Sequence, residues 1–299
     1  MGTCFPQPIA LASTFDDVLV EQVADCIGKE CRAVGVRQVL APVVNVCRDS
    51  RWGALWKLSG KTYYGVEHLR RNRGRCMGAL YWQLNDCWPV ASWASIDGYG
   101  RYKALHYEAK RFFEPIHISC EETGEYSTRK DITDERYYGY ETKAKLFVNN
   151  DTLQDVEGVV EWQLCACDGA VLQKGSEKLS VKALSYASLE EMDFHKTDVR
   201  NNYLAYSFKV GGEVVSFGTV LFTKPKHFNF IDPKVKVDVC DGYLLVKADA
   251  YAKYVYISNE NDDLILSDNF FDMEKGVKRV EIISGNPTNI TVKTVFDIQ

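Results

Sequence analysis

The 299-residue chain lacks several features that would place it in a class of proteins at once. It has no uninterrupted apolar run of about 18 residues, so we expect no transmembrane helix and no membrane partner. The N-terminus lacks the basic, apolar and small-residue series of a secretion signal, and we therefore expect a cytoplasmic protein. The 41 acidic and 36 basic residues are mixed along the chain, which argues against nucleic acid as a partner.

The ten cysteines also lack the spacing of a metal site. None forms a CxxC pair, and Cys165 and Cys167 are followed by no second ligand pair. We expect reduced thiols in a reducing compartment, with neither a metal ion nor a cofactor. No internal repeat is present, and 46% apolar residues are enough for folded cores.

The first part of the chain has the periodicity of helices and buried strands. Residues 16–33 place apolar residues at intervals of four after two aspartates, which predicts a helix. Apolar runs at 36–46 and 76–84 predict buried strands of a parallel sheet. Two further helices are predicted at 62–74 and 101–113, so this part has an α/β pattern.

Farther along the chain the period changes to two, which is typical of antiparallel strands. Segments 160–166, 204–212 and 235–246 alternate apolar and polar residues. The turn pairs Asp168-Gly169 and Asp241-Gly242 lie after the first segment and within the third. Short alternating strands with a turn signal every ten or so residues predict β-sandwich domains.

The stretch GALYWQLNDCWPVASW, residues 78–93, holds three of the six tryptophans beside an Asn-Asp pair. Together with its flanks, residues 71–113, it resembles the last strand, loop and closing helix of the catalytic barrel in β-mannosidases of glycoside hydrolase family 2. LSDNFFDM, residues 266–273, resembles the signature of the small C-terminal immunoglobulin-like domain of those enzymes. The resemblance covers about residues 60–299.

This resemblance implies sugar-contacting residues in the loop. Trp82 corresponds to an aromatic platform under the sugar next to the cleaved bond, and Asn85, Asp86 and Trp88 follow at the same end of the strand. A flat ring beside amide and carboxylate acceptors complements the C–H faces and hydroxyls of a sugar. Core packing with one polar turn is the alternative for all three tryptophans, Trp82, Trp88 and Trp93. The implied partner is a β-linked mannoside or a related glycan.

The paired catalytic carboxylates of such enzymes are missing. A retaining glycosidase needs two carboxyl groups about 5.5 Å apart, and in the resembled family both are glutamates on earlier barrel strands. Neither of their motifs precedes Tyr81 in this chain. Glu67 lies on a predicted helix, where we expect it to pair with Arg70 or Arg71. We assign no catalytic residue.

The N-terminal segment resembles a different glycosidase. Residues 3–53, which end in APVVNVCRDSRWG, are similar in order and spacing to the early barrel region of family 3 β-glucosidases. Asn45, Cys47 and Ser50 stand where that family usually has Asp, Ala and Pro. The pattern indicates a join, near residues 52–58, between the front of one barrel and the back of another.

A (β/α)8 barrel needs about 250 residues, which this first part of the chain does not supply. We therefore predict an α/β fold, an incomplete TIM-barrel fragment, followed by all-β structure in two immunoglobulin-like sandwiches. Exposed barrel edges would favour self-association. The expected domains are a family 3-like barrel fragment at 1–53, the last strand and helices of a family 2-like barrel at 54–115, and sandwiches at 116–225 and 226–299.

Three functions fit these features. One is a β-mannosidase-like fragment or fusion without hydrolytic activity of its own. Another is a non-catalytic carbohydrate-binding or accessory module that docks on a glycosidase. The third is a β-mannosidase whose missing acid and base groups come from a second chain or from the true upstream gene.

Overall fold

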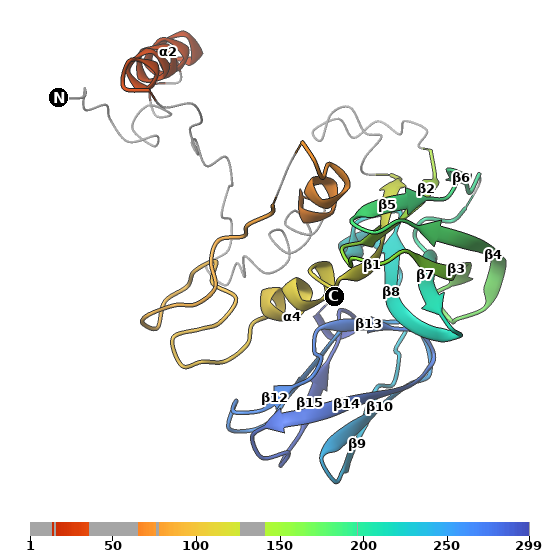
Figure 1. Cartoon of the computed structure of the whole chain (residues 1–299). Helices are drawn as coiled ribbons and strands as arrows, with labels where there is room; N and C mark the ends of the chain where they lie inside the picture. The colour runs from red at the N-terminus through yellow and green to blue at the C-terminus, as the bar shows by residue number, and fades with distance from the viewer. Residues whose placement is uncertain are drawn as a thin grey trace. The chain divides into compact units, whose positions relative to one another are not determined.

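A computed structural model describes residues 14, 16–35, 65–75, 78–125, 141–195 and 197–298 (Figure 1). The chain divides into two compact units, residues 1–52 and 53–299. In the first unit, α2 (Asp17–Ala33) begins after Asp16, whose carboxylate accepts a hydrogen bond from the backbone N–H of Leu19 at 2.9 Å. The helix predicted at 16–33 is thus confirmed, whereas the strand predicted at 36–46 lies outside the described residues.

The second unit contains a first β-sandwich made of two antiparallel sheets. One sheet pairs β2 (Lys143–Asn150) with β1 (Ile116–Thr123), β5 (Ser185–Ser188) and β6 (Met192–Asp193). The other has the order β4 (Val171–Val181), β3 (Val156–Ala166), β7 (Asn202–Val210) and β8 (Glu213–Leu221). The alternating segments predicted at 160–166 and 204–212 lie on β3 and β7, which confirms both as strands.

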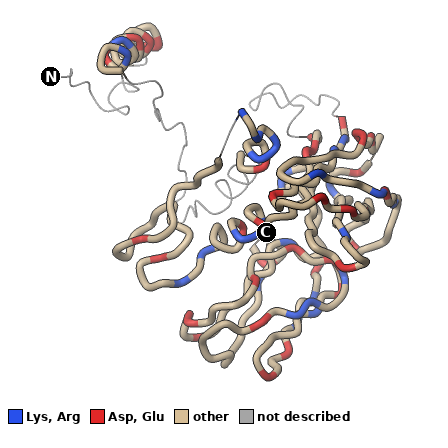
Figure 2. The backbone as a smooth tube through the Cα atoms, in the orientation of Figure 1, with Lys and Arg blue, Asp and Glu red and all other residues tan. Residues whose placement is uncertain are grey.

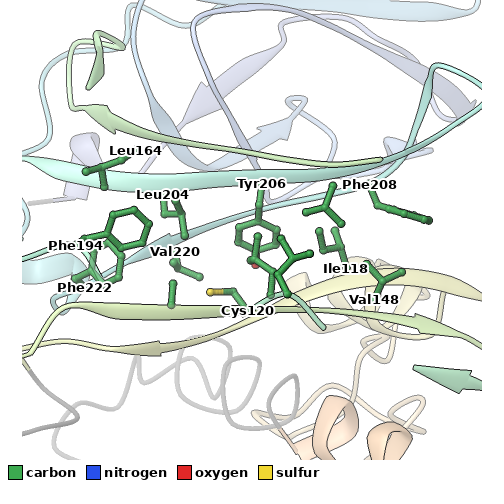
Figure 3. Close-up of a cluster of buried hydrophobic side chains, with 14 of the residues drawn as sticks. Ile118, Cys120, Val148, Leu164, Phe194, Leu204, Tyr206, Phe208, Val220 and Phe222 are labelled. Atoms are coloured by element: carbon green, nitrogen blue, oxygen red, sulfur yellow. The ribbon is translucent and has the colours of Figure 1, made fainter. Parts of the chain in front are cut away.

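The core of this sandwich lies between its two sheets (Figure 3). Leu164 on β3 and Leu204 and Phe208 on β7 face Ile118 and Val148 of the other sheet, and all five are buried. Burial of one such side chain contributes about 1.5–3 kcal/mol. The apolar positions of the period-two pattern are therefore those that hold the two sheets together.

A second, smaller sandwich follows after a short 3-10 helix, η1 (Pro225–His227). Its strands are β9 (Lys236–Cys240), β10 (Tyr243–Ala248), β11 (Ala252–Ser258), β12 (Ile265–Leu266), β13 (Phe271–Met273), β14 (Gly276–Ser284) and β15 (Thr291–Lys293). One sheet has the order β12-β14-β10-β9 and the other β13-β11-β15. Gly242, at a φ of 78°, supplies the predicted turn between β9 and β10.

A further cluster of buried side chains joins the two sandwiches. Tyr203 of the first stacks on Tyr251 of the second, with ring centroids 3.9 Å apart. Phe228 and Phe230, from the connection between the sandwiches, pack into the same cluster.

Lys and Arg are interspersed with Asp and Glu along the described backbone (Figure 2). No helix in the described ranges is both long and apolar enough to cross a bilayer.

The barrel-like part of the second unit consists of a helix at 65–71, a long loop and α4 (Ala104–Phe112). Both predicted helices are confirmed, although each is shorter than the predicted ranges 62–74 and 101–113. The buried strand predicted at 76–84 is wrong for the residues described, 78–84, which belong to no strand. The physical reason is that the described residues provide no neighbouring parallel strand to cover this apolar run.

Candidate functional site

The segment 78–84 has two unlike faces. Ala79 and Tyr81 pack against a small core between the two helices, formed by Val66, Leu105, Ala109 and Phe112. Leu80 and Trp82 lie on the other face and are 98% and 74% exposed, respectively. Alternation with a period of two is the geometry of an extended strand that is covered on one side only. The helices therefore bury one face of this segment and leave Trp82 on the open face.

Backbone hydrogen bonds hold the loop that follows. The N–H groups of Ser95 and Ile96 donate to the carbonyls of Gln83 and Leu84, both at 2.9 Å. The N–H of Asp86 donates to the carbonyl of Ile96 at 3.0 Å. The loop therefore folds back on the segment that carries Trp82.

Asp86 is the charged anchor of this loop. Its side chain is buried, and its two carboxylate oxygens accept hydrogen bonds from Ser92 Oγ at 2.5 Å and from Lys103 Nζ at 3.0 Å. The hydrogen bond from Ser92 and the nearby Lys103 ammonium lower the pKa of Asp86, against the opposing effect of burial. Both oxygens are thus engaged within the loop.

Ser95 is a second, uncharged anchor. It is fully buried, and its hydroxyl donates to the carbonyl of Leu84 at 2.8 Å. Tyr81 and His106 approach the same hydroxyl, at 3.1 Å from the phenol oxygen and 3.3 Å from Nδ1. Burial lowers the pKa of His106, which favours the neutral ring in this structural role.

The other predicted sugar-contacting residues lie on the surface of the loop. Trp82, Asn85 and Trp88 are exposed, and the Asn85 amide donates to the carbonyl of Asp86 at 3.2 Å. The peptide bond between Trp82 and Gln83 is cis. At Gly98 a Cβ atom would lie 2.7 Å from the carbonyl carbon of Trp88, so only glycine fits this close approach. Trp93, which is 39% exposed, is not buried in a core either. The loop therefore presents three exposed indoles and one amide, whereas Asp86 is buried.

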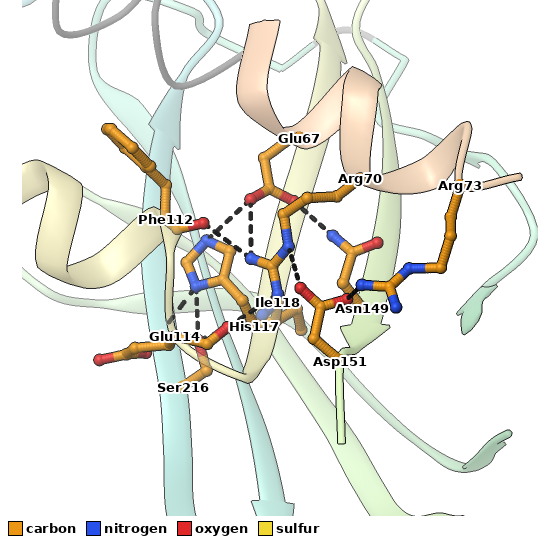
Figure 4. A network of polar contacts seen from close by, with 10 residues as sticks. All are labelled: Glu67, Arg70, Arg73, Phe112, Glu114, His117, Ile118, Asn149, Asp151 and Ser216. Carbon is orange, nitrogen blue, oxygen red and sulfur yellow. Dashed lines mark hydrogen bonds and ion pairs between the residues drawn. The ribbon is translucent and has the colours of Figure 1, made fainter. Parts of the chain in front are cut away.

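A buried polar network attaches the helix at 65–71 to the first sandwich (Figure 4). Glu67 pairs with Arg70, as predicted, at 3.3 Å, and also accepts a hydrogen bond from Asn149 on β2 at 2.5 Å. Arg70 reaches Asp151 at 3.2 Å. Arg71 pairs instead with Glu121 on β1. Glu67 is buried in this docking network, which holds the helix at 65–71 on the first sandwich.

The second sandwich holds α4 through the segment that resembles the family signature. Arg111 donates to Asp268 at 2.8 Å and to the carbonyl of Asn269 at 2.6 Å, and Lys110 donates to the carbonyl of Ser267 at 2.7 Å. Sequence reasoning missed this role. The available signal was a basic pair in the last turn of a predicted helix and an acid in the LSDNFFDM segment.

No group of three or more metal-ligating side chains occurs in the described parts of the chain. Asp268 also pairs with Lys278, and Asp272 with Lys253, each at 2.7 Å. The acids of the LSDNFFDM segment therefore have ammonium and guanidinium partners.

The sandwiches and their contacts define a class of domain. Residues 142–227 match the family described as Mannosidase Ig/CBM-like domain, and residues 231–298 match an Ig-fold domain family of the mannosidase type. Residues 1–64 match the N-terminal domain of glycosyl hydrolase family 3. The chain thus has a segment of the glycosyl hydrolase family 3 type followed by two immunoglobulin-like domains of the mannosidase type. These matches confirm both resemblances.

Several of the similar curated proteins are β-mannosidases. The β-mannosidase of Mus musculus is 59% identical over 44 residues, which are 15% of this chain and 5% of that protein. β-Mannosidase A of Aspergillus fumigatus is 24% identical over 182 residues, which are 56% of this chain and 18% of that protein. The chain therefore spans less than a fifth of the length of either relative.

Solved structures show the same fold. The β-D-mannosidase of Dictyoglomus thermophilum superposes with a TM-score of 0.63 at 23% identity, over 79% of this chain and 28% of that one. The exo-chitosanase of Amycolatopsis orientalis gives a TM-score of 0.56 at 18% identity, over 81% and 33% of the two chains. At these identities the likeness concerns the fold alone.

Proposed function

We propose that the second unit acts as the C-terminal module of a β-mannosidase-type glycosidase, in which Trp82 is a platform for a β-linked mannose. The observation that carries this proposal is the exposed indole on the face of segment 78–84 turned away from the helices. In a (β/α)8 barrel that face is the interior one, and substrates bind at the C-terminal ends of the strands. The similarity to β-mannosidases supports mannoside as the ligand class.

We infer that this module does not hydrolyse glycosides alone. Retaining hydrolysis needs two carboxyl groups about 5–5.5 Å apart, one as acid and the other as nucleophile. Of the acids near the loop, Asp86 has both oxygens engaged by Ser92 and Lys103, and Glu67 is buried in the docking network. Asp97 binds the Arg101 side chain at 2.6 Å. The two carboxyl groups would therefore come from further barrel strands.

A binding experiment tests the platform. The full chain is titrated with β-mannobiose while tryptophan fluorescence is recorded, and an aryl β-mannoside assay is run in parallel. We expect binding without turnover, and Trp82→Ala should weaken the Kd about tenfold, because the stacked ring is lost. Leu80→Ala is the matched control, since Leu80 is exposed on the same face two residues away.

Two outcomes would contradict the proposal. Equal affinities of Trp82→Ala and Leu80→Ala would remove the indole from the site. Turnover of the aryl mannoside that survives purification and disappears in Trp82→Ala would show that the chain contains its own acid and base groups.

A second candidate, an accessory module that binds another protein, is favoured by the apolar surface beside Trp82. Leu80, Leu84, Trp88 and Val90 are all exposed on the loop. We propose that this surface mediates self-association or contact with a glycosidase, which sedimentation of the wild type and of a Leu80→Ser, Leu84→Ser variant would test.

A cytoplasmic location also stays a prediction. The cysteines described are free thiols.

A further inference from the structure

A hollow of about 660 Å³ lies on the outer face of the β4-β3-β7-β8 sheet, next to Glu274 of the second sandwich. Leu164 on β3 and Leu204 on β7 point into the core. The residues that alternate with them along each of these strands therefore point outward. One part of this outer face is covered by the stacked rings of Tyr203 and Tyr251. The hollow is the part that the second sandwich leaves open.

Strand register places four lining residues in one row across the sheet. Glu161 on β3 is paired with Ser176 on β4 and with Ser207 on β7. Ser207 is in turn paired with Phe217 on β8, whose ring is exposed. With neighbouring strands about 4.8 Å apart, the row is about 14 Å long. It thus presents hydroxyl and carboxylate groups at one end and an aromatic ring at the other.

Glu274 lies beside this row, and its carboxylate is only partly engaged in hydrogen bonds. Its Oε1 accepts hydrogen bonds from Gln163 Nε2 at 2.7 Å and from the Tyr203 hydroxyl at 3.4 Å, and Cys165 Sγ lies 3.9 Å away. Within the described ranges, no hydrogen bond reaches Oε2 and no cation pairs with this carboxylate. Burial raises the pKa of Glu274. The free oxygen can accept a hydrogen bond from a ligand.

The charges around the hollow balance. Its charged lining residues are two acids, Glu161 and Glu274, and two bases, Lys174 and Lys209. Glu161 and Lys209 pair at 2.7 Å. Neither a strongly anionic nor a strongly cationic ligand is favoured by such a lining. The volume lies within the range of ligand sites, about 300–1,000 Å³.

From this arrangement we propose that the hollow binds a neutral, hydroxyl-rich oligosaccharide, with the Phe217 ring as an apolar platform and Glu274 Oε2 and the Ser207 hydroxyl as hydrogen-bond partners. Sugars offer an apolar C–H face together with hydroxyl donors, which matches a ring beside a half-buried acceptor. The site lies on the sandwiches, so it does not depend on the platform proposed at Trp82.

The test is a titration of the 15N-labelled full chain with a linear β-mannotriose, followed by NMR. We expect shifts at the amides of Glu161, Ser207 and Phe217, and we expect Trp82→Ala to leave them unchanged. Glu274→Gln and Phe217→Ala should each weaken the Kd at this site about tenfold, because a hydrogen bond to a charged group or the platform is lost.

Glu177→Gln is the matched control, because it makes the same charge change on β4. Glu177 is paired with Val160, a core residue, and is therefore on the opposite face of the sheet. Wild-type affinity in Glu274→Gln and in a folded Phe217→Ala, or no shifts in this row with mannotriose at millimolar concentration, would overturn the proposal. Loss of shifts near Trp82 alone would contradict the platform and leave this site in place.

Discussion

Replacing Arg70 with methionine tests whether the buried network fixes the barrel-like part on the first sandwich. The Arg70 side chain is 6% exposed and donates to Glu67, to Asp151 and to the carbonyls of Phe112 and Glu114, the last two both at 2.7 Å (Figure 4). Methionine fills much of the same volume without any donor. The substitution therefore leaves the buried Glu67 carboxylate without its guanidinium partner.

The expected cost is large for a single side chain. Removing one partner of a buried ion pair destabilises a protein by about 3–5 kcal/mol, since the remaining charge stays buried. Arg73→Met is the matched control, because Arg73 also pairs with Asp151 but its side chain is 35% exposed. An exposed pair contributes about 0–1 kcal/mol. We expect the two variants to differ by at least about 2 kcal/mol in the free energy of unfolding.

Urea unfolding and amide hydrogen exchange measure this difference. Unfolding followed by tryptophan fluorescence gives the free energy, and exchange locates the effect. Arg70→Met should lower the protection of amides 66–71 while strands β3 and β7 keep theirs. Equal unfolding midpoints for Arg70→Met and Arg73→Met, or unchanged exchange in the helix, would refute the reasoning.

Three further predictions concern the loop, the sheet and the first unit. The hydrogen bond from Ser92 lowers the pKa of Asp86 in the folded protein. The Asp86 carboxylate therefore stabilises the loop fully above the ordinary pKa of about 3.9, and this stabilisation is lost as the pH falls through the lower pKa of the folded state. Tryptophan fluorescence should report this transition, and Asp86→Asn should abolish it. Gly175→Ala puts a Cβ 2.5 Å from the Trp162 ring and should cost about 1–3 kcal/mol in a thermal melt, whereas Gly65→Ala, with nothing within 4 Å, should not destabilise. No side chain of α2 is buried, so its amides should exchange far faster than those of β7; equal protection would contradict this.

The sandwich strands could be predicted where one face is buried. β3 and β7 alternate in sequence because their inward residues meet the opposite sheet. β4 (Val171–Val181) could not be predicted in this way, because it is an edge strand whose residues are mostly exposed on both faces. The turn pairs carried more information there, since Asp168-Gly169 leads directly into β4.

The loop that carries the candidate site was predictable from its aromatic residues, but its folded geometry was predictable only in part. The aromatic residues of 78–93 indicated where to look, but segment 78–84 is apolar on both faces, so its sequence does not distinguish the open face from the covered one. Asp86 reads as a sugar acceptor beside Asn85. Its actual partners, Ser92 and Lys103, are brought to it by a loop whose path depends on backbone hydrogen bonds.

The position of Trp82 follows from two docking networks that work independently of a closed barrel. The helix at 65–71 is fixed to the first sandwich by Arg70, and α4 is fixed to the second by Arg111. Segment 78–84 lies against the core that these two helices share. The proposed platform would thus be ordered before any ligand arrives, and binding need not supply the entropy cost of ordering the loop. The proposed mannoside binding at Trp82 should therefore require Arg70 and Arg111 to be intact, although neither is proposed to touch the sugar.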